Sequence, residues 1–195
     1  MILYVHSDTS YLYIKKSRSH TGSIKFLSDA NPESIDYKTS VPLMNRIIHV
    51  VCKILRNVMA SSTEADLGLL FVNSQYTAPS RTTLVEMNHP QLPNPIKMDN
   101  STSVGISNVA IKQRISKAID TWFYWIWCRI KQDQFIVYWN PRNDVFGDYR
   151  TNLHYPTHHI MVCPVYLHDP KGSTVTLQGC VNSDISARIE CVLSA

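Results

Sequence analysis

The chain has 195 residues, of which 44% are hydrophobic and 17% are charged, and its formal net charge is +4 at pH 7. This composition supports a core in one domain with extensions, and it excludes intrinsic disorder over most of the length. The small positive excess is compatible with a phosphate-bearing partner. The five cysteines form no CxxC pair, which disfavours zinc and disulfides and indicates a reducing, intracellular compartment. No segment has the length and apolarity expected of a signal peptide or membrane span.

The first predicted elements are strands. Ile2–His6 is predicted as a buried strand, with hairpin neighbours at Tyr11–Lys15 and Ser23–Leu27. A polar turn is predicted over residues 17–22, and the proline-containing residues 28–42 are predicted to form a loop.

The next predicted elements are one segment of ambiguous type and two helices. Ile47–Met59 is apolar with embedded bases and is predicted as a strand or as the lead into a helix. The hydroxyl side chains of Ser61–Thr63 and the acid Glu64 are typical of a helix start, so a helix is predicted over about residues 63–75. Pro79–Asn88 is predicted as a second, short helix.

The second half is predicted to alternate strands and helices. Residues 89–95 contain three prolines and form a turn before a strand at Pro95–Met98. Ser116–Lys131 is the longest helix candidate, followed by a strand at Phe135–Trp139 and a short helix or turn at Asp144–Thr151. The predicted inner stripe of the long helix consists of Ile119, Phe123, Ile126 and Ile130.

Acidic residues stand at the ends of predicted strands. Asp8 follows the first strand, Asp99 follows Pro95–Met98, and other acids occur at predicted helices. Active sites of α/β folds lie at such carboxyl ends of strands. A cluster of like charges is costly without cations. Two Mg²⁺ ions about 3.5–4 Å apart would offset that cost and activate water for phosphodiester hydrolysis. The pattern therefore predicts a two-metal carboxylate site.

Five motifs follow one another along the chain. They are Tyr4-Val-His-Ser-Asp8, Met59-Ala-Ser-Ser-Thr-Glu-Ala-Asp66, Pro95-Ile-Lys-Met-Asp-Asn-Ser101, Ser116-Lys-Ala-Ile-Asp120 with Phe123-Tyr-Trp-Ile126, and Gly147-Asp-Tyr-Arg-Thr151. With these motifs the chain resembles the RNase H domain of copia-type Gag-Pol polyproteins of LTR retrotransposons, from about Ile2 to His168. The order and spacing of the motifs together make the resemblance specific.

The resemblance implies an α/β, RNase H-like fold with a five-stranded mixed sheet flanked by helices. We expect this domain over residues 1–152, with a connection and poorly structured tail over residues 153–195. The implied activity is Mg²⁺-dependent endonucleolytic cleavage of the RNA strand of an RNA–DNA hybrid, with Mn²⁺ as a substitute for the two Mg²⁺ ions. The implied context is a polyprotein with an upstream reverse transcriptase domain, in cytoplasmic virus-like particles or the nucleus.

By position, the resemblance implies that Asp8, Asp99 and Asp148 are catalytic metal ligands. The fourth ligand is an acid early in a helix, and Asp66 is favoured over Glu64 because the small and apolar residues after Asp66 fit the family's context. Residues two apart on a helix point about 200° apart, so only one of these two can face the metal. An aspartate there is one methylene shorter than the family's glutamate.

Candidate nucleic-acid contacts are Asn100, Lys112, Arg114 and Lys117. A capped turn and a solvated helix face are equally good interpretations of these residues. Some bases expected of the family are absent. The chain is therefore interpreted as an active ribonuclease H or, alternatively, as a catalytically inactive, retrotransposon-derived nucleic-acid-binding relic. An integrase-type core is disfavoured by the early helix acid.

Overall fold

The computed structural model describes residues 1–28, 47–108, 117–142, 145–151 and 156–157, without the side chains of residues 117–120. The chain divides into two units, Met1–Leu153 and His154–Ala195, and the elements described below belong to the first. The predicted tail lies almost wholly outside the described residues. No helix in the described segments combines the length and apolarity needed to cross a bilayer.

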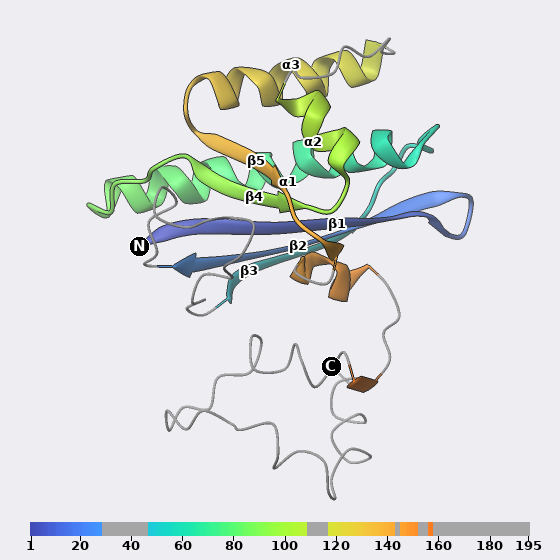
Figure 1. Ribbon diagram of the computed structural model, residues 1–195, viewed down its shortest axis with the longest axis horizontal. Coiled ribbons are helices and arrows are strands. Elements are labelled where there is room, and N and C mark those ends of the chain that lie inside the picture. Colours follow the sequence, from blue (N-terminus) through green and yellow to red (C-terminus); the bar gives the residue numbers. More distant parts are fainter. Residues whose placement is uncertain (29–46, 109–116, 143–144, 152–155, 158–195) are drawn as a thin grey trace, which may run out of the picture. The chain divides into compact units, whose positions relative to one another are not determined.

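The first unit is built on a five-stranded mixed sheet with strand order β3-β2-β1-β4-β5 (Figure 1). Strands β1, β2 and β3 pair antiparallel, whereas β4 pairs parallel with both β1 and β5. This is the predicted fold. The strands are β1 Ile2–Ile14, β2 Arg18–Ser28, β3 Ile47–Ile54, β4 Asn94–Met98 and β5 Phe135–Trp139.

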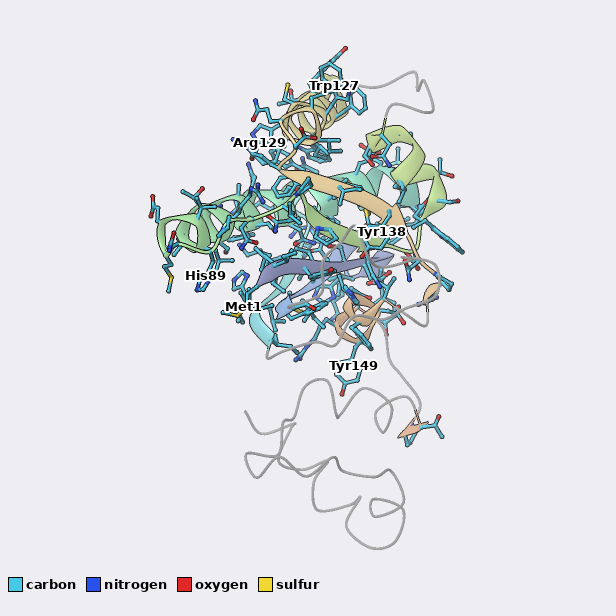
Figure 2. The ribbon with its side chains drawn as sticks, turned by 60° about the vertical axis from the view of Figure 1, so that its left-hand side comes forward. Met1, His89, Trp127, Arg129, Tyr138 and Tyr149 are labelled. Atoms are coloured by element: carbon cyan, nitrogen blue, oxygen red, sulfur yellow. The ribbon has the colours of Figure 1, made fainter. Side chains whose placement is uncertain are left out.

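Helices cover one face of the sheet, and a short 3-10 helix lies against the other (Figure 1). The helices are α1 Ser62–Glu86, α2 Ser101–Ser107 and α3 Lys117–Lys131, and the 3-10 helix is η3 Phe146–Arg150. Figure 2 shows this separation, because Trp127 and Arg129 of α3 lie on the opposite side of the sheet from Tyr149 of η3.

Strands β1 and β4 are buried on both faces over most of their length, which agrees with the apolar run Ile2–Val5 at the start of β1. On the helical face Val5 of β1 and Ile96 of β4 are fully buried against Leu69 of α1. On the other face Tyr4 stacks on Phe26 with ring centroids 5.5 Å apart. The two sets of side chains alternate along β1, so the sheet supports a core on the helical face and a seat for η3 on the other.

The predicted first hairpin was wrong in its boundaries. Tyr11–Lys15 is not a separate strand, because β1 continues to Ile14 through an irregularity between Ser10 and Ile14. Leu12 within it has a φ of 53°, a conformation that breaks the alternation on which the prediction depended. The predicted turn over residues 17–22 belongs mostly to β2, and the turn itself lies at residues 15–17.

The two predicted helices at 63–75 and 79–88 form the single helix α1, which has 25 residues and contains Pro79. A proline inside a helix costs about 3 kcal/mol or more. Contacts after the proline offset this cost, because Arg81 donates to the carbonyls of Leu92 and Gln91 at 2.6 and 2.7 Å and to Asn94 Oδ1 at 2.8 Å. Helix α1 is consequently longer than α3, which has 15 residues and was predicted to be the longest.

A buried lysine lies between β2 and α1. Lys25 is fully buried, its Nζ is 3.1 Å from His49 Nδ1 and 5.2 Å from the centroid of the Tyr76 ring, and burial lowers its pKa to about 7. In the part of the chain that the structure describes, no acid forms an ion pair with Lys25. The charged form of Lys25 therefore destabilises the fold at neutral pH.

Replacing Lys25 with methionine is expected to raise the free energy of unfolding at pH 7, because the variant buries no charge. The pKa of Lys25 is lower in the folded chain. The unfolded wild type therefore binds more protons above pH 7, and wild-type stability should rise from pH 7 to pH 9. Urea unfolding of the wild type and of Lys25→Met at pH 7 and pH 9 measures both effects. Lys53→Met, which replaces an exposed lysine, is the control. A Lys25→Met variant less stable than wild type at pH 7 would contradict it.

Candidate active site

A cleft of about 480 Å³ opens beside the C-terminal end of β4 and a polar stretch of β1. Acids from separate elements line it: Asp8 of β1, Asp66 of α1 and Asp99, which follows β4. Asp148 of η3 adds its negative charge to the surroundings of both Asp8 and Asp99. Three of the four acids named from the sequence thus line one cleft, and the fourth, Asp148, acts electrostatically on two of them. Their catalytic and metal-binding roles stay predictions.

Asp8 is the most central of these acids. Its side chain is buried, and Oδ2 accepts a hydrogen bond from the Thr151 hydroxyl. Burial, together with the charges of Asp99, Asp148 and Asp66, raises the pKa of Asp8 to about 7 against the opposing hydrogen bond from Thr151. The site therefore stores electrostatic repulsion that a bound cation would relieve.

The two candidate helix acids have different surroundings. Glu64 forms a capping box, because its backbone N–H donates to Ser61 Oγ at 3.1 Å and its Oε2 accepts from Ala60 N at 2.6 Å. Asp66 is buried in the cleft, and its Oδ2 accepts from Asn100 Nδ2 at 2.6 Å. Burial, followed by the charge of Asp99, raises the pKa of Asp66 to about 7 against opposing hydrogen bonds. Asp66, and not Glu64, occupies the position expected of the helix acid.

Asp99 and Asn100 connect β4 to α2, a short helix that the sequence analysis did not predict. Burial raises the pKa of Asp99, and the positive charge of Arg142 opposes this rise. Asn100 caps α2, because its Oδ1 accepts from Thr102 N and Ser103 N at 3.0 and 3.2 Å. The amide group of Asn100 thus bonds to protein at both its oxygen and its nitrogen, which supports the capped-turn interpretation.

Arg142 is a site residue that the sequence reasoning missed. Its Nε and a terminal guanidinium nitrogen donate to Asp148 Oδ1 at 3.0 and 2.8 Å. The Arg142 side chain is 57% exposed and lines the cleft, whereas the Asp148 side chain is 7% exposed. The available signal was a base six residues before a candidate ligand. Arg142 holds the last acid and presents a positive charge to the cleft.

Two glycines determine how closely η3 approaches the sheet. A Cβ on Gly22 would lie 2.8 Å from Thr151 Cγ2 and 2.9 Å from the carbonyl oxygen of Gly147. A Cβ on Gly147 would lie 2.8 Å from the backbone nitrogen of Asp8. Because glycine has a hydrogen atom in place of Cβ, η3 can lie in direct contact with β1 and β2. This contact places Asp148 and Thr151 beside Asp8.

The donor chemistry of the site fits Mg²⁺, because the ligands are carboxylate oxygens in a half-open cleft. Within the described segments, no three histidine, cysteine or acidic side chains are grouped closely enough to hold a metal ion. Each buried acid instead accepts a hydrogen bond from a protein donor. These donors are Thr151 for Asp8, Asn100 for Asp66 and Arg142 for Asp148.

The remaining candidate contacts give less information. Lys112 and Arg114 lie outside the described residues, and Lys117 is described only as the first residue of α3. Aromatic side chains of α3, namely Trp122, Phe123 and Trp125, pack against the core. The Trp122 ring stacks on the Phe71 ring, with the ring centroids 5.9 Å apart. Trp122 also lies against Gly68, where an added Cβ would be 3.0 Å from the indole ring.

No protein-family model and no curated protein matches the chain. Among solved structures, LC11-RNase H1, isolated from compost by a metagenomic approach, is similar with a TM-score of 0.52 at 9% identity over 76% of this chain and 91% of that one. The N-terminal RNase H domain of Rv2228c from Mycobacterium tuberculosis, solved as a fusion with maltose-binding protein, is similar with a TM-score of 0.51 at 12% identity over 77% and 91%. Together with the strand order, these likenesses show that the chain has an RNase H-like fold.

Proposed function

We propose that this chain is an RNase H-type endoribonuclease that cleaves the RNA strand of RNA–DNA hybrids. The observation that carries the proposal is a set of four carboxylates, from β1, α1, the end of β4 and η3, that influence one another electrostatically at one edge of an RNase H-like fold. Catalytic side chains drawn from several strand and helix ends are typical of sites that assemble only on folding. The sequence motifs further support an origin in a copia-type retrotransposon polyprotein with a reverse transcriptase domain upstream.

Asp8, Asp66, Asp99 and Asp148 would hold the divalent cations. Two such ions, when bound, activate a water and stabilise the leaving oxygen of a phosphodiester. The chain's own groups organise the site. Thr151 orients the Asp8 carboxylate, and Arg142 holds the Asp148 carboxylate with two donors. Arg142 also places a half-exposed positive charge where a substrate phosphate would enter the cleft.

The direct test is a cleavage assay with the purified chain, a labelled RNA–DNA hybrid and Mg²⁺ or Mn²⁺. We expect nicks in the RNA strand, no cleavage of double-stranded DNA, and loss of activity with a chelator. The cleavage rate should be low, because the side chain of Asp66 is one methylene shorter than the glutamate of the resembled family. A misplacement of a catalytic group by about 1 Å can lower the rate about 100-fold. Cleavage that persists in chelator, or equal cleavage of double-stranded DNA, would contradict the proposal. A polymerase palm with paired aspartates in the upstream reading frame would test the proposed origin.

A catalytically inactive nucleic-acid-binding relic is the second candidate. It is favoured by the shorter acid at Asp66, whose carboxylate is engaged by Asn100. Titration calorimetry with Mg²⁺ distinguishes the two candidates, because a relic with a broken site should bind the ion no better than its Asp99→Asn variant does. Tight Mg²⁺ binding by the wild type that is lost in Asp99→Asn would favour the active nuclease over the relic.

A further inference from the structure

A cysteine–histidine pair lies outside the acid cluster, on neighbouring strands. Cys52 of β3 pairs in register with Gly22 of β2, and His20 lies two residues before Gly22. The Sγ atom of Cys52 is 3.1 Å from His20 Nε2 and 3.8 Å from the backbone oxygen of Arg150. Cys52 is exposed, so small molecules can reach its thiol.

The geometry is that of a nucleophile and its proton acceptor. Side chains of these two kinds within hydrogen-bond reach are the usual arrangement of an activated thiol. Burial lowers the pKa of His20, which keeps the imidazole neutral, and in the tautomer with its proton on Nδ1 the ring can accept the thiol proton at Nε2. Cys128 provides a contrast, because it is also exposed but has no histidine partner in the described part of the chain.

We propose that Cys52 is a covalent modification site that reacts with small-molecule disulfides, and that the adduct loosens η3. In this exchange the Cys52 thiol passes its proton to His20 Nε2, and its sulfur attacks one sulfur of the disulfide. The disulfide's own S–S bond breaks as the new one forms. The departing thiolate then takes a proton back from His20. The products are one mixed disulfide at Cys52 and one free small thiol.

The position of Cys52 connects this reaction to the acid cluster. Gly22, its register partner, has no space for even one methyl group beneath η3. The Cys52 sulfur itself contacts η3 at Arg150, next to Thr151, which bonds to Asp8. An adduct several atoms long at this edge competes with η3 for space. The regulatory part of this inference rests on the proposed function, whereas the thiol reactivity does not.

The first experiment compares rates of modification. The whole chain is treated with oxidised glutathione, and peptide mass spectrometry follows the mixed disulfides at Cys52 and Cys128. A positioned proton acceptor contributes about 100-fold or more in enzymes. We expect at least about tenfold faster reaction at Cys52 in this exposed site. His20→Gln should bring Cys52 down to the rate of Cys128, and His20→Asn serves as a second variant if the first folds poorly. Equal rates at both cysteines, or no effect of the His20 variants, would overturn the proposal.

The second experiment measures the effect on η3. Hydrogen exchange of residues 146–151 should accelerate in the glutathione adduct of the wild type but stay unchanged in treated Cys52→Ser. RNA-strand cleavage should fall in parallel and recover when a reductant removes the adduct. A chain without nuclease activity would refute the proposed function but leave the exchange measurement valid. Unchanged exchange in a fully modified wild type would overturn the proposed loosening of η3.

Discussion

Asp99→Asn is expected to abolish cleavage of the RNA strand while leaving the protein folded. The substitution removes one of the charges that would bind the cations, and the loss of several kcal/mol of charge stabilisation corresponds to about 10³-fold or more in rate. The same change relieves electrostatic repulsion, because the negative charge of Asp99 raises the pKa of both Asp8 and Asp66. The melting temperature in chelator should therefore stay equal or rise, so activity and stability move in opposite directions.

Asp133→Asn is the matched control for this experiment. Asp133 is exposed between α3 and β5, and its φ of 53° is a conformation that asparagine adopts readily. Its cleavage rate and melting temperature should equal those of the wild type. Retention of more than a tenth of wild-type activity by Asp99→Asn would remove Asp99 from the proposed set of metal ligands.

Asp66→Glu is expected to raise the cleavage rate by about 10- to 100-fold, because a 1 Å error in the position of a catalytic group can cost about 100-fold. The longer side chain would restore the reach of the glutamate found at this position in the family that the sequence resembles. It must also displace the 2.6 Å hydrogen bond between Asp66 and Asn100, so the gain should depend on Mg²⁺ concentration. Single-turnover cleavage rates across a Mg²⁺ titration measure both effects.

Glu64→Asp is the matched control, since it changes acid length two residues away. Glu64 contributes to the capping box and does not line the cleft. Shortening it should cost about 0.5–1 kcal/mol of stability and leave the cleavage rate unaltered. If neither the wild type nor Asp66→Glu cleaves the hybrid with Mg²⁺ or Mn²⁺, the inactive relic becomes the better explanation.

The sequence predicted those features that local pattern determines. The strand over Phe135–Trp139 was predicted with its observed bounds, because five apolar and aromatic residues lie between polar segments. The choice of Asp66 over Glu64 followed from the small and apolar residues after Asp66, which fit the context that the resemblance implies, while helical geometry allowed only one of the two acids to face the site. In both cases the necessary information lies within a few residues along the chain.

The features that escaped prediction depend on distant contacts. The passage of α1 through Pro79 is supported by bonds from Arg81 to the segment before β4, which no local pattern reveals. The role of Arg142 depends on its two hydrogen bonds to Asp148, six residues later in the chain. Helix α2 has only seven residues and depends on Asn100, which was considered as a nucleic-acid contact as well as a turn residue.

The close approach of η3 has a consequence for how related sequences should be compared. The last acid keeps its place because residues 22 and 147 have no side chain, and neither residue carries any chemical function of its own. A chain could retain every aspartate and still lose the site through an alanine at one of these positions. Comparisons that score only the acidic motifs would count such a chain as intact. The two glycines therefore belong in any sequence signature used to decide whether such a chain can form this site.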